Sequence, residues 1–183
     1  MALEEVTQRM NRITSAFDNH KVPYALIGGQ AVAVWVASKE PGLVRTTKDV
    51  DLLLDRKDLE QAKQAAGTVD MDYHFVNGIG MFLERLNPSP RHGVHLVWAD
   101  EQIRDGDPVK APPISEAERV PPGMAVISLR ALVTMKLLAN RDHDRTHLRD
   151  MIEAGLIDRS IISELPLQLA PRLEALLNEM EKA

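Results

Sequence analysis

The sequence predicts an α/β (α+β) fold: a mixed sheet flanked by helices, with a C-terminal helical extension. Short apolar runs of strand length alternate with longer stretches in which apolar residues recur at helical spacing. A proline-rich connection over residues 105–123 leads to one last short strand, after which only helical patterns remain. We therefore expect a core over residues 1–127 and a helical part over residues 128–183, packed together as one compact unit.

The elements of the core follow from apolar spacing and from the residues that interrupt it. In the first helix, Val6, Met10, Ile13 and Phe17 lie at helical intervals. The predicted elements are, in chain order, a helix over 3–20, a strand from residue 24, a helix from the double glycine to about residue 37, an apolar strand beginning at the acidic pair near residue 50, a helix over 57–66, and strands over 73–76, 81–86, 94–99 and 125–127.

Capping and helix-stopping residues divide the C-terminal part. Ser128 is predicted to cap a helix whose apolar stripe includes Leu132 and Leu137. A charged helix follows and ends at Gly155, because glycine commonly terminates helices. Two further short helices are expected, and the last opens with Pro171 in its first turn.

Asp49 and Asp51 are the most informative residues in the chain. They stand two apart at the start of an apolar strand, so their side chains are expected on the same side of the sheet edge. At about 6 Å, two carboxylates repel by about 3 kcal/mol at an effective dielectric constant near 20. A hard cation such as Mg²⁺ would relieve that repulsion, since it prefers oxygen ligands and shares its shell with water and phosphates.

The acidic pair also fits a simpler interpretation. An acidic strand edge could be neutralised by Lys48, by Arg45 and by backbone donors, and the Asp-x-Asp spacing is common. The spacing alone does not separate this interpretation from a metal site.

A double glycine, Gly28-Gly29, stands between the first predicted strand and an apolar helix. Glycines at such a turn let the backbone approach a ligand and leave N–H groups free at the helix start, which suits phosphate. A tight packing joint without a ligand is the alternative. A dinucleotide-binding fold is disfavoured, because Gln30 and Ala31 break the G-x-G-x-x-G spacing.

Together, the strand–Gly-Gly–helix unit and the Thr-x-Asp-x-Asp strand resemble the nucleotidyltransferase fold of the DNA polymerase β superfamily. The resemblance is closest to a small bacterial branch that includes the abortive-infection type II toxin-like proteins. Two later segments are similar to that branch: the helix over 126–141, which carries Lys136, and the charged segment over 142–151, which contains Asp150. The likeness covers about residues 22–158 and depends on the order of these motifs.

The resemblance implies a role for each motif. Gly28 and Gly29 would hold the nucleotide phosphates, and Asp49 and Asp51 would bind Mg²⁺, with Mn²⁺ as an alternative. Lys136 would meet the triphosphate of a nucleoside triphosphate (NTP), which would be the substrate.

Two assignments from the resemblance have alternatives. Lys136 could be an ordinary exposed lysine on an amphipathic helix. Asp150 would support the site indirectly, by holding the residues that contact metal or substrate. Alternatively, it would pair on the helix surface with Arg149 or another basic neighbour.

Active members of the family usually add a third carboxylate from a later strand, and this chain departs from that pattern. The matching strand, over 94–99, has His95 where an aspartate is expected. Asp100 falls on the opposite phase near the strand end, and Glu84 would have to substitute from a neighbouring segment. A neutral imidazole at His95 could act as a catalytic base, but it adds no negative charge for a second Mg²⁺.

These motifs lead to the hypothesis of a Mg²⁺-dependent nucleotidyltransferase that moves a nucleoside monophosphate from an NTP to an acceptor hydroxyl. The acceptor could be RNA, a protein side chain or a small molecule. The resemblance also allows a toxin with a cognate antitoxin or another partner protein. The alternative, which His95 favours, is a catalytically inactive module of the same fold that binds a nucleotide or a protein partner.

The charged helix has two further interpretations. His143 and His147 lie one helical turn apart, as in a transition-metal pair, but the sequence offers no evident third ligand. Three arginines at helical spacing could meet phosphate or form a solvated face with acidic neighbours: Arg141, Arg145 and Arg149.

Composition limits the function classes. The net charge is −5, so the molecule as a whole does not attract nucleic acid. The chain has no cysteine, which excludes disulfides and thiolate chemistry. Its longest apolar run is too short for a membrane span. We expect a cytoplasmic protein that does not associate with a membrane.

Overall fold

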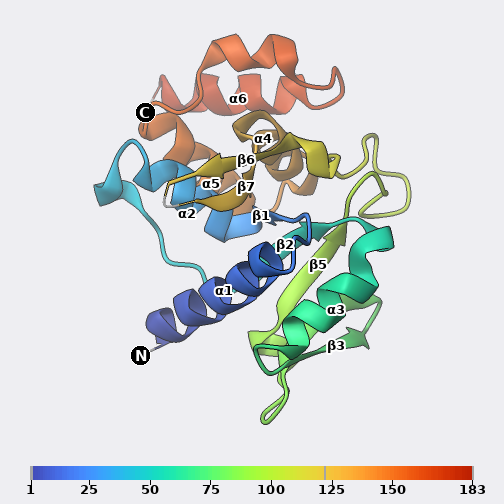
Figure 1. The fold of residues 1–183 in the computed structure, drawn as a ribbon. Helices are drawn as coiled ribbons and strands as arrows, with labels where there is room; N and C mark the ends of the chain where they lie inside the picture. The colour runs from blue at the N-terminus through green and yellow to red at the C-terminus, as the bar shows by residue number, and fades with distance from the viewer. Residues whose placement is uncertain (1, 122, 183) are drawn as a thin grey trace.

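The mixed sheet predicted from the sequence is present (Figure 1). A computed structural model of the chain describes residues 2–121 and 123–182, and in that part the sheet has seven strands. The strands are β1 (Ala25–Ile27), β2 (Val50–Leu54), β3 (Met71–Val76), β4 (Ile79–Glu84), β5 (Val94–Trp98), β6 (Ala117–Val120) and β7 (Met124–Ile127). The α-helices are α1 (Ala2–Asn19), α2 (Gly28–Ala37), α3 (Leu59–Gly67), α4 (Leu129–Ala139), α5 (Asp142–Glu153) and α6 (Ala170–Met180), and a 3₁₀ segment, η5 (Arg159–Glu164), precedes α6.

The strand order is β3-β4-β5-β2-β1-β7-β6. β2 is parallel to β5 and antiparallel to β1, and β1 is parallel to β7. In this register Asp51 of β2 lies opposite Ile27 of β1 on one side and opposite His95 of β5 on the other. Because α2 begins directly after Ile27, the register brings the Gly28–Gly29 turn beside the acidic end of β2.

Two groups of helices accompany the sheet. α1 and α3 pack against each other and lie in front of the strands in Figure 1. α2, α4 and α5 contact one another in the second group, and α6 packs on α5. The second group includes the helix that starts at the double glycine and both helices that carry the predicted cationic residues.

Buried apolar side chains form one cluster that spans the chain. It includes Ile13 and Phe17 of α1, Leu53 of β2, Leu132 of α4 and Leu173 of α6, each with almost no exposed surface. Truncating such a side chain to alanine typically costs about 2–5 kcal/mol of stability. The predicted boundary at residue 127 falls between β7 and α4, and the division into a core and a helical part stays a prediction.

One predicted segment differs from the structure. The proline-rich stretch over 105–123 is predicted as an extended connection, whereas the structure forms β6 within it, paired antiparallel with β7. β6 occupies one edge of the sheet and exposes the charged side chains of Glu118 and Arg119. A strand of this kind is stabilised by its partner and lacks the apolar run from which strands are predicted. The other predicted strands and helices are confirmed, with boundaries that differ by a few residues.

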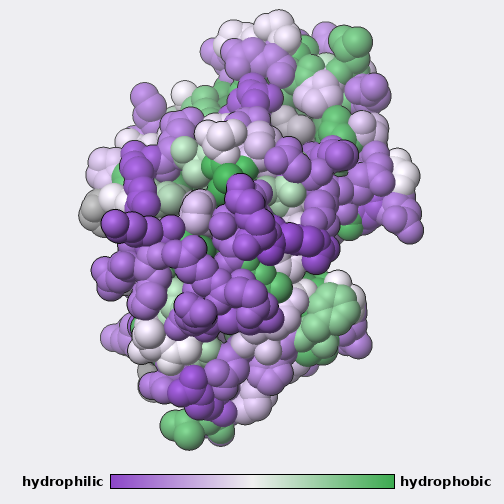
Figure 2. Space-filling model, turned by 45° about the vertical axis from the view of Figure 1, so that its right-hand side comes forward, coloured by the Kyte–Doolittle hydropathy of each residue, from purple (hydrophilic) through white to green (hydrophobic). Residues whose placement is uncertain are grey.

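The surface visible in Figure 2 is mostly hydrophilic, with apolar side chains in small separate areas. Among the described residues, the most exposed large apolar side chains are Phe75, Leu86 and Leu167, which belong to different parts of the chain. No helix in residues 2–121 and 123–182 combines the length and the apolar character that a membrane crossing requires.

Candidate active site

The turn from β1 into α2 accepts only glycine at its first position. Gly28 has a φ of +68°, and a Cβ atom there would overlap the carboxylate of Asp51. At Gly29 a Cβ atom would lie 2.9 Å from Oγ1 of Thr47. Within the described residues, α2 starts without a side-chain cap and without an acidic residue in its first turn. The turn therefore combines close backbone approach with helix N–H groups that no capping side chain occupies.

Asp49 and Asp51 lie beside this turn. Asp51 is in β2, and Asp49 directly precedes the strand. Both line a cleft of about 640 Å³ whose wall also includes Gly28 and Gly29. The structure therefore brings together the acidic pair and the glycine turn, which are separated by about twenty residues in sequence.

The loop before β2 is held from two sides. Gln30 donates a hydrogen bond from Nε2 to the Thr47 carbonyl oxygen at 3.2 Å. Arg45 donates from Nε to both carboxylate oxygens of Asp150 in α5, at 2.9 and 2.7 Å. The Asp150 side chain is almost fully buried, and burial strengthens such a pair while making its loss costly. The loop that leads to Asp49 is thus tied to both α2 and α5.

These contacts correct two interpretations of the sequence. Arg45 pairs with Asp150 and is not the counter-ion of the acidic pair. Within the described ranges, no ion pair joins Lys48 to Asp49 or Asp51, so the simpler acidic-edge interpretation loses the two side chains it named. The surface alternative for Asp150 is also wrong, because this carboxylate is buried and pairs with Arg45, while Arg149 pairs with Glu179 of α6.

His95 contacts Asp51 directly. Its Nδ1 lies 3.4 Å from Oδ1 of Asp51, and its Nε2 lies 3.2 Å from the Pro90 carbonyl oxygen. A neutral imidazole carries only one N–H, whereas the protonated ring donates to both partners. The hydrogen bond with Asp51 accordingly raises the pKa of His95, with a smaller contribution from Pro90, although partial burial opposes the rise.

Neither Glu84 nor Asp100 replaces the third carboxylate beside the acidic pair. Glu84 pairs with Arg12 at 3.0 Å and does not line the cleft. Asp100 lies just after β5 at a φ of +60° and does not line it either. In residues 2–121 and 123–182, no three His, Asp or Glu side chains converge as a ready metal-binding group. A metal ion at Asp49 and Asp51 would thus take its other ligands from water and substrate.

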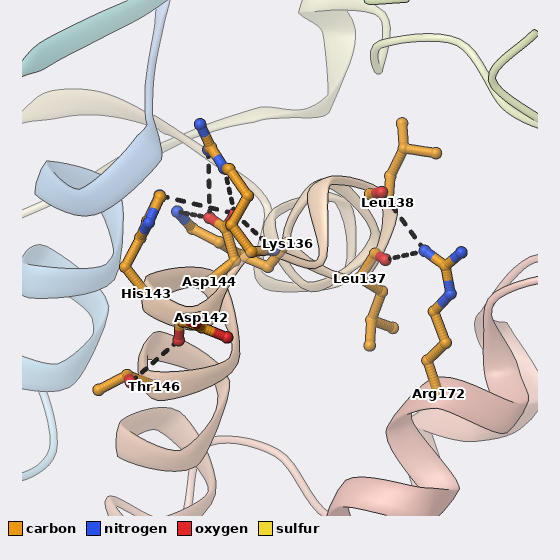
Figure 3. A network of polar contacts seen from close by, with 9 residues as sticks. Lys136, Leu137, Leu138, Asp142, His143, Asp144, Thr146 and Arg172 are labelled. Carbon is orange, nitrogen blue, oxygen red and sulfur yellow. Dashed lines mark hydrogen bonds and ion pairs between the residues drawn. The ribbon is translucent and has the colours of Figure 1, made fainter.

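The cleft is also lined by an ion-pair cluster of α4 and the start of α5 (Figure 3). Lys136 of α4 donates from Nζ to Oδ1 of Asp144 at 2.9 Å, and Arg141 donates from Nε to Oδ2 of the same carboxylate at 2.7 Å. Burial alone would raise the pKa of Asp144, but the hydrogen bonds from Arg141 and Lys136 outweigh it and lower this pKa. Lys136 is only 5% exposed, so the interpretation as an ordinary surface lysine is wrong.

The end of α4 is fixed next to this cluster. Asn140 takes the left-handed conformation at the helix end, and Arg172 of α6 donates from one terminal nitrogen to the carbonyl oxygens of Leu137 and Leu138, at 2.6 and 3.3 Å (Figure 3). These contacts satisfy carbonyl groups that a helix end leaves free. Lys136 thus lies in the last turn of α4, which Asn140 closes and Arg172 holds by hydrogen bonds.

Solved structures that resemble this chain share one fold. The solution structure of the antibiotic-resistance factor ANT(2'')-Ia has a TM-score of 0.57 and 12% identity, covering 100% of this chain and 94% of that chain. The crystal structure of ANT(2'')-Ia in complex with adenylyl-2''-tobramycin has a TM-score of 0.52 and 16% identity, with 98% of each chain covered. An antigenic nucleotidyltransferase-like protein from Paracoccidioides brasiliensis has a TM-score of 0.54 and 18% identity, covering 100% of this chain and 89% of that chain. The chain has the nucleotidyltransferase fold.

At these identities the likeness concerns the nucleotidyltransferase fold alone. No protein-family model and no curated protein sequence matches the chain. Membership of the abortive-infection type II toxin-like branch stays a prediction.

The cleft of this nucleotidyltransferase fold brings together six of the residues that the sequence singled out. All line it: Gly28, Gly29, Asp49, Asp51, His95 and Lys136. Their chemical roles stay predictions. The arginine stripe divides, because Arg141 lines the cleft whereas Arg145 and Arg149 pair with Glu179 of α6.

His143 and His147 also line the cleft, with ring centroids 6.2 Å apart in an edge-to-face arrangement. Burial lowers the pKa of His147 to about 4, assisted by Lys136, and its Nδ1 is buried with no hydrogen-bond partner among the described residues. Among residues 2–121 and 123–182, no third ligand converges with His143 and His147. The structure therefore gives no support to a transition-metal site at these two histidines.

Sequence reasoning missed two features of the site. Asp144 was not singled out, although it lies three residues after Arg141 and eight after Lys136. The i, i+3 spacing of Arg141 and Asp144 was the available signal. The pairing of Arg45 with Asp150, 105 residues apart, had no local signal.

Proposed function

We propose that this chain is a Mg²⁺-dependent nucleotidyltransferase that moves a nucleoside monophosphate from an NTP to an acceptor hydroxyl. One observation carries the proposal: Asp49 and Asp51 line the same cleft as the Gly28–Gly29 turn at the start of α2. Carboxylates beside free helix N–H groups can serve a cation and phosphates at the same place.

The acidic pair suits Mg²⁺, with Mn²⁺ as an alternative. Mg²⁺ is usually held by one or two carboxylates and keeps waters and substrate phosphates in the rest of its shell. Asp49 and Asp51 would be two such ligands, and the described residues add no third ligand that would close the shell. When bound, the ion would supply stabilisation of the negative charge that develops on the transferring phosphoryl group.

The chain's own groups would then position the reactants. The N–H groups at Gly28 and Gly29 would bind the β- and γ-phosphates, and Lys136 would offset charge on the leaving pyrophosphate. The acceptor oxygen would bond to the α-phosphorus while the bond to the pyrophosphate oxygen breaks. The proton that the acceptor hydroxyl releases would pass to His95, which can act as the base only in its neutral form.

Transfer of label tests this proposal. The protein is incubated with each α-labelled NTP, Mg²⁺ and cell extract, and labelled products are counted. Transfer is expected, and Asp49→Ala should lower it about 1,000-fold, as expected for loss of a group that acts mainly in the transition state. Glu118→Gln, an exposed acid on the far edge strand β6, is the matched control and should retain full transfer. Equal transfer by wild type and Asp49→Ala would refute the proposal.

A catalytically inactive module that binds a nucleotide or a protein partner is the second candidate. The contact of His95 with Asp51 favours it, because a histidine stands where a third carboxylate is expected. Binding of an NTP without transfer, for all four NTPs and with Mn²⁺ as well as Mg²⁺, would select this candidate.

The acceptor is the least determined part of the proposal. RNA, a protein side chain and a small molecule are all candidates, and tobramycin in the ANT(2'')-Ia complex is an example of a small-molecule acceptor in that protein. A role as the toxin of a two-gene pair predicts growth arrest on expression that a neighbouring small gene relieves. Normal growth in the absence of that gene would exclude the toxin role.

A further inference from the structure

Asp144 is the centre of a polar cluster that includes Lys136 and Arg141, and Nε2 of His143 lies 3.6 Å from the same carboxylate. The side chain of Asp144 is 1% exposed and that of Lys136 is 6% exposed, whereas that of Arg141 is 56% exposed. All three line the cleft (Figure 3 labels Lys136 and Asp144). One carboxylate thus holds two cations: Lys136, which is buried in α4, and Arg141, which directly precedes α5 and is exposed.

The cluster keeps one positive charge in excess. Burying a lone carboxylate is unfavourable, and two cations more than compensate it. Asp144 also accepts a hydrogen bond from the backbone N–H of Arg141 at 3.3 Å, which fixes the first turn of α5. The carboxylate therefore orders both the side chain and the backbone of the residue that presents the exposed guanidinium.

Donors remain free on both cations. A lysine ammonium has three N–H donors and an arginine guanidinium has five. Nζ of Lys136 uses one on Asp144, and Arg141 uses Nε and, at 3.5 Å, one terminal nitrogen. The remaining donors belong to side chains whose rotamers are already restricted, so binding an anion costs them less conformational entropy.

We propose that Asp144 is a positioning residue that holds Lys136 and Arg141 as one phosphate-binding unit for the triphosphate. The inference rests on the proposed function and adds Arg141 as a second cationic contact. Arg141 supplies the planar donor edge suited to phosphate, and Lys136 supplies a compact charge deeper in the wall. Neither cation performs this role independently of Asp144.

Two other arginines of α5 offer a matched comparison. Glu179 of α6 is also a carboxylate shared by two cations, with Arg145 at 3.4 Å and Arg149 at 3.1 Å. It is 52% exposed, and none of its three members lines the cleft. Glu179→Gln therefore removes a doubly paired carboxylate without touching the site.

Calorimetric titration of the full chain with Mg²⁺ and a non-hydrolysable ATP analogue tests the unit. Arg141→Gln, half exposed and expected to fold, should weaken binding about tenfold, the effect of one charge-assisted contact. Asp144→Asn should weaken it at least as much, and adding Arg141→Gln to Asp144→Asn should change the dissociation constant less than about twofold. Glu179→Gln should bind as the wild type does.

Additive effects of Asp144→Asn and Arg141→Gln would overturn the inference, as would wild-type affinity in either single variant. If Asp144→Asn does not fold, the variant Lys136→Met with Asp144→Leu replaces the buried pair by apolar groups. Arg141→Gln should then change affinity less than about twofold in that background, and a full tenfold effect would again overturn the inference. Absence of both binding and transfer in the wild type would instead refute the proposed function, and this inference with it.

Discussion

Gly28 shows how backbone conformation and site geometry depend on one another. Its φ of +68° is a conformation that residues with a side chain rarely adopt, and the Asp51 carboxylate occupies the space that a Cβ atom would need. The absent side chain therefore lets the acidic end of β2 lie directly against the start of α2. Two motifs that are separate in sequence become one site through this contact.

Gly28→Ala should destabilise the fold by about 2–4 kcal/mol, from backbone strain together with displacement of Asp51. Gly106→Ala is the control, because Gly106 also has a positive φ, +83°, but has nothing within 4 Å of the Cβ position. It should lose only about 1 kcal/mol from strain. Urea unfolding of both variants measures the difference. Equal losses would show that the contact with Asp51 adds nothing.

His147 predicts a pH-dependent part of the stability. Its pKa is about 4 in the fold against 6.5 ordinarily, so the fold favours the neutral ring. The stabilisation is complete above about pH 6.5 and is lost as the pH falls from there toward 4. Lys136, Asp144, Asp150 and His143 all contribute to its electrostatic surroundings.

Replacing His147 by phenylalanine removes this titration. Between about pH 7.5 and pH 4.5, the wild type should lose about 2 kcal/mol more unfolding free energy than His147→Phe. This loss is smaller than the full pKa shift implies, because the ring is partly exposed. Urea titrations of both proteins at both pH values measure this difference. An identical loss of unfolding free energy in the two proteins would show that His147 does not have a lowered pKa in the fold.

At the residue scale, local patterns predicted the candidate site residues but not the contacts that hold them in place. The spacing of Asp49 and Asp51 and the double glycine are visible within a dozen residues each, and the resemblance added Lys136 and His95. Asp144 and the pair of Arg45 with Asp150 depend on how α4, α5 and the loop before β2 meet in space. Without that packing, each is one charged residue among many.

The loop over residues 44–49 is the element whose order matters most to the site. It contains no α-helix or strand and depends on the contacts of Gln30 with Thr47 and of Arg45 with Asp150. Loops of this kind are ordered only as far as side-chain contacts hold them. Asp49, a predicted metal ligand, lies at the end of this loop. The conformational order of the loop therefore determines how well the Asp49 side chain is positioned.

Asp150→Asn should loosen this loop. The amide weakens the charge-assisted bonds to Arg45, by about 1–3 kcal/mol. Amide hydrogen exchange of residues 44–49 should become several-fold faster, and transfer activity should fall about tenfold. Glu179→Gln also breaks ion pairs of α5 but lies away from the loop, so its exchange pattern should match the wild type. Unchanged protection of the loop in Asp150→Asn would refute this role for the ion pair.

At the element scale, the helices and the apolar strands were predictable because burial imposes a period on the sequence. β6 was not, because an edge strand with exposed Glu118 and Arg119 depends on its pairing with β7. The Ser128 cap illustrates a prediction confirmed in detail: its hydroxyl oxygen accepts a hydrogen bond from the Ala131 N–H at 3.3 Å.

On the scale of the whole molecule, the sheet register and the second helix group build one cleft with two unlike walls. The sheet side supplies the acidic pair and His95, and the helical side supplies Lys136, Arg141 and Asp144. A metal-bound triphosphate carries both charge types, and under the proposed function its cation would bind at the aspartates and its phosphates at the amides and the cationic side chains. The net charge of −5 gives no general attraction for such a ligand, so its binding depends on this local arrangement.

We propose that a divalent cation binds at Asp49 and Asp51, beside the glycine turn. A crystal soaked with Mn²⁺ and a non-hydrolysable NTP would locate the metal by its anomalous scattering. We expect a peak bonded to both carboxylates, with the phosphates against the N–H groups of Gly28 and Gly29. Nucleotide or metal bound elsewhere, with the two aspartates free of both, would refute the metal site.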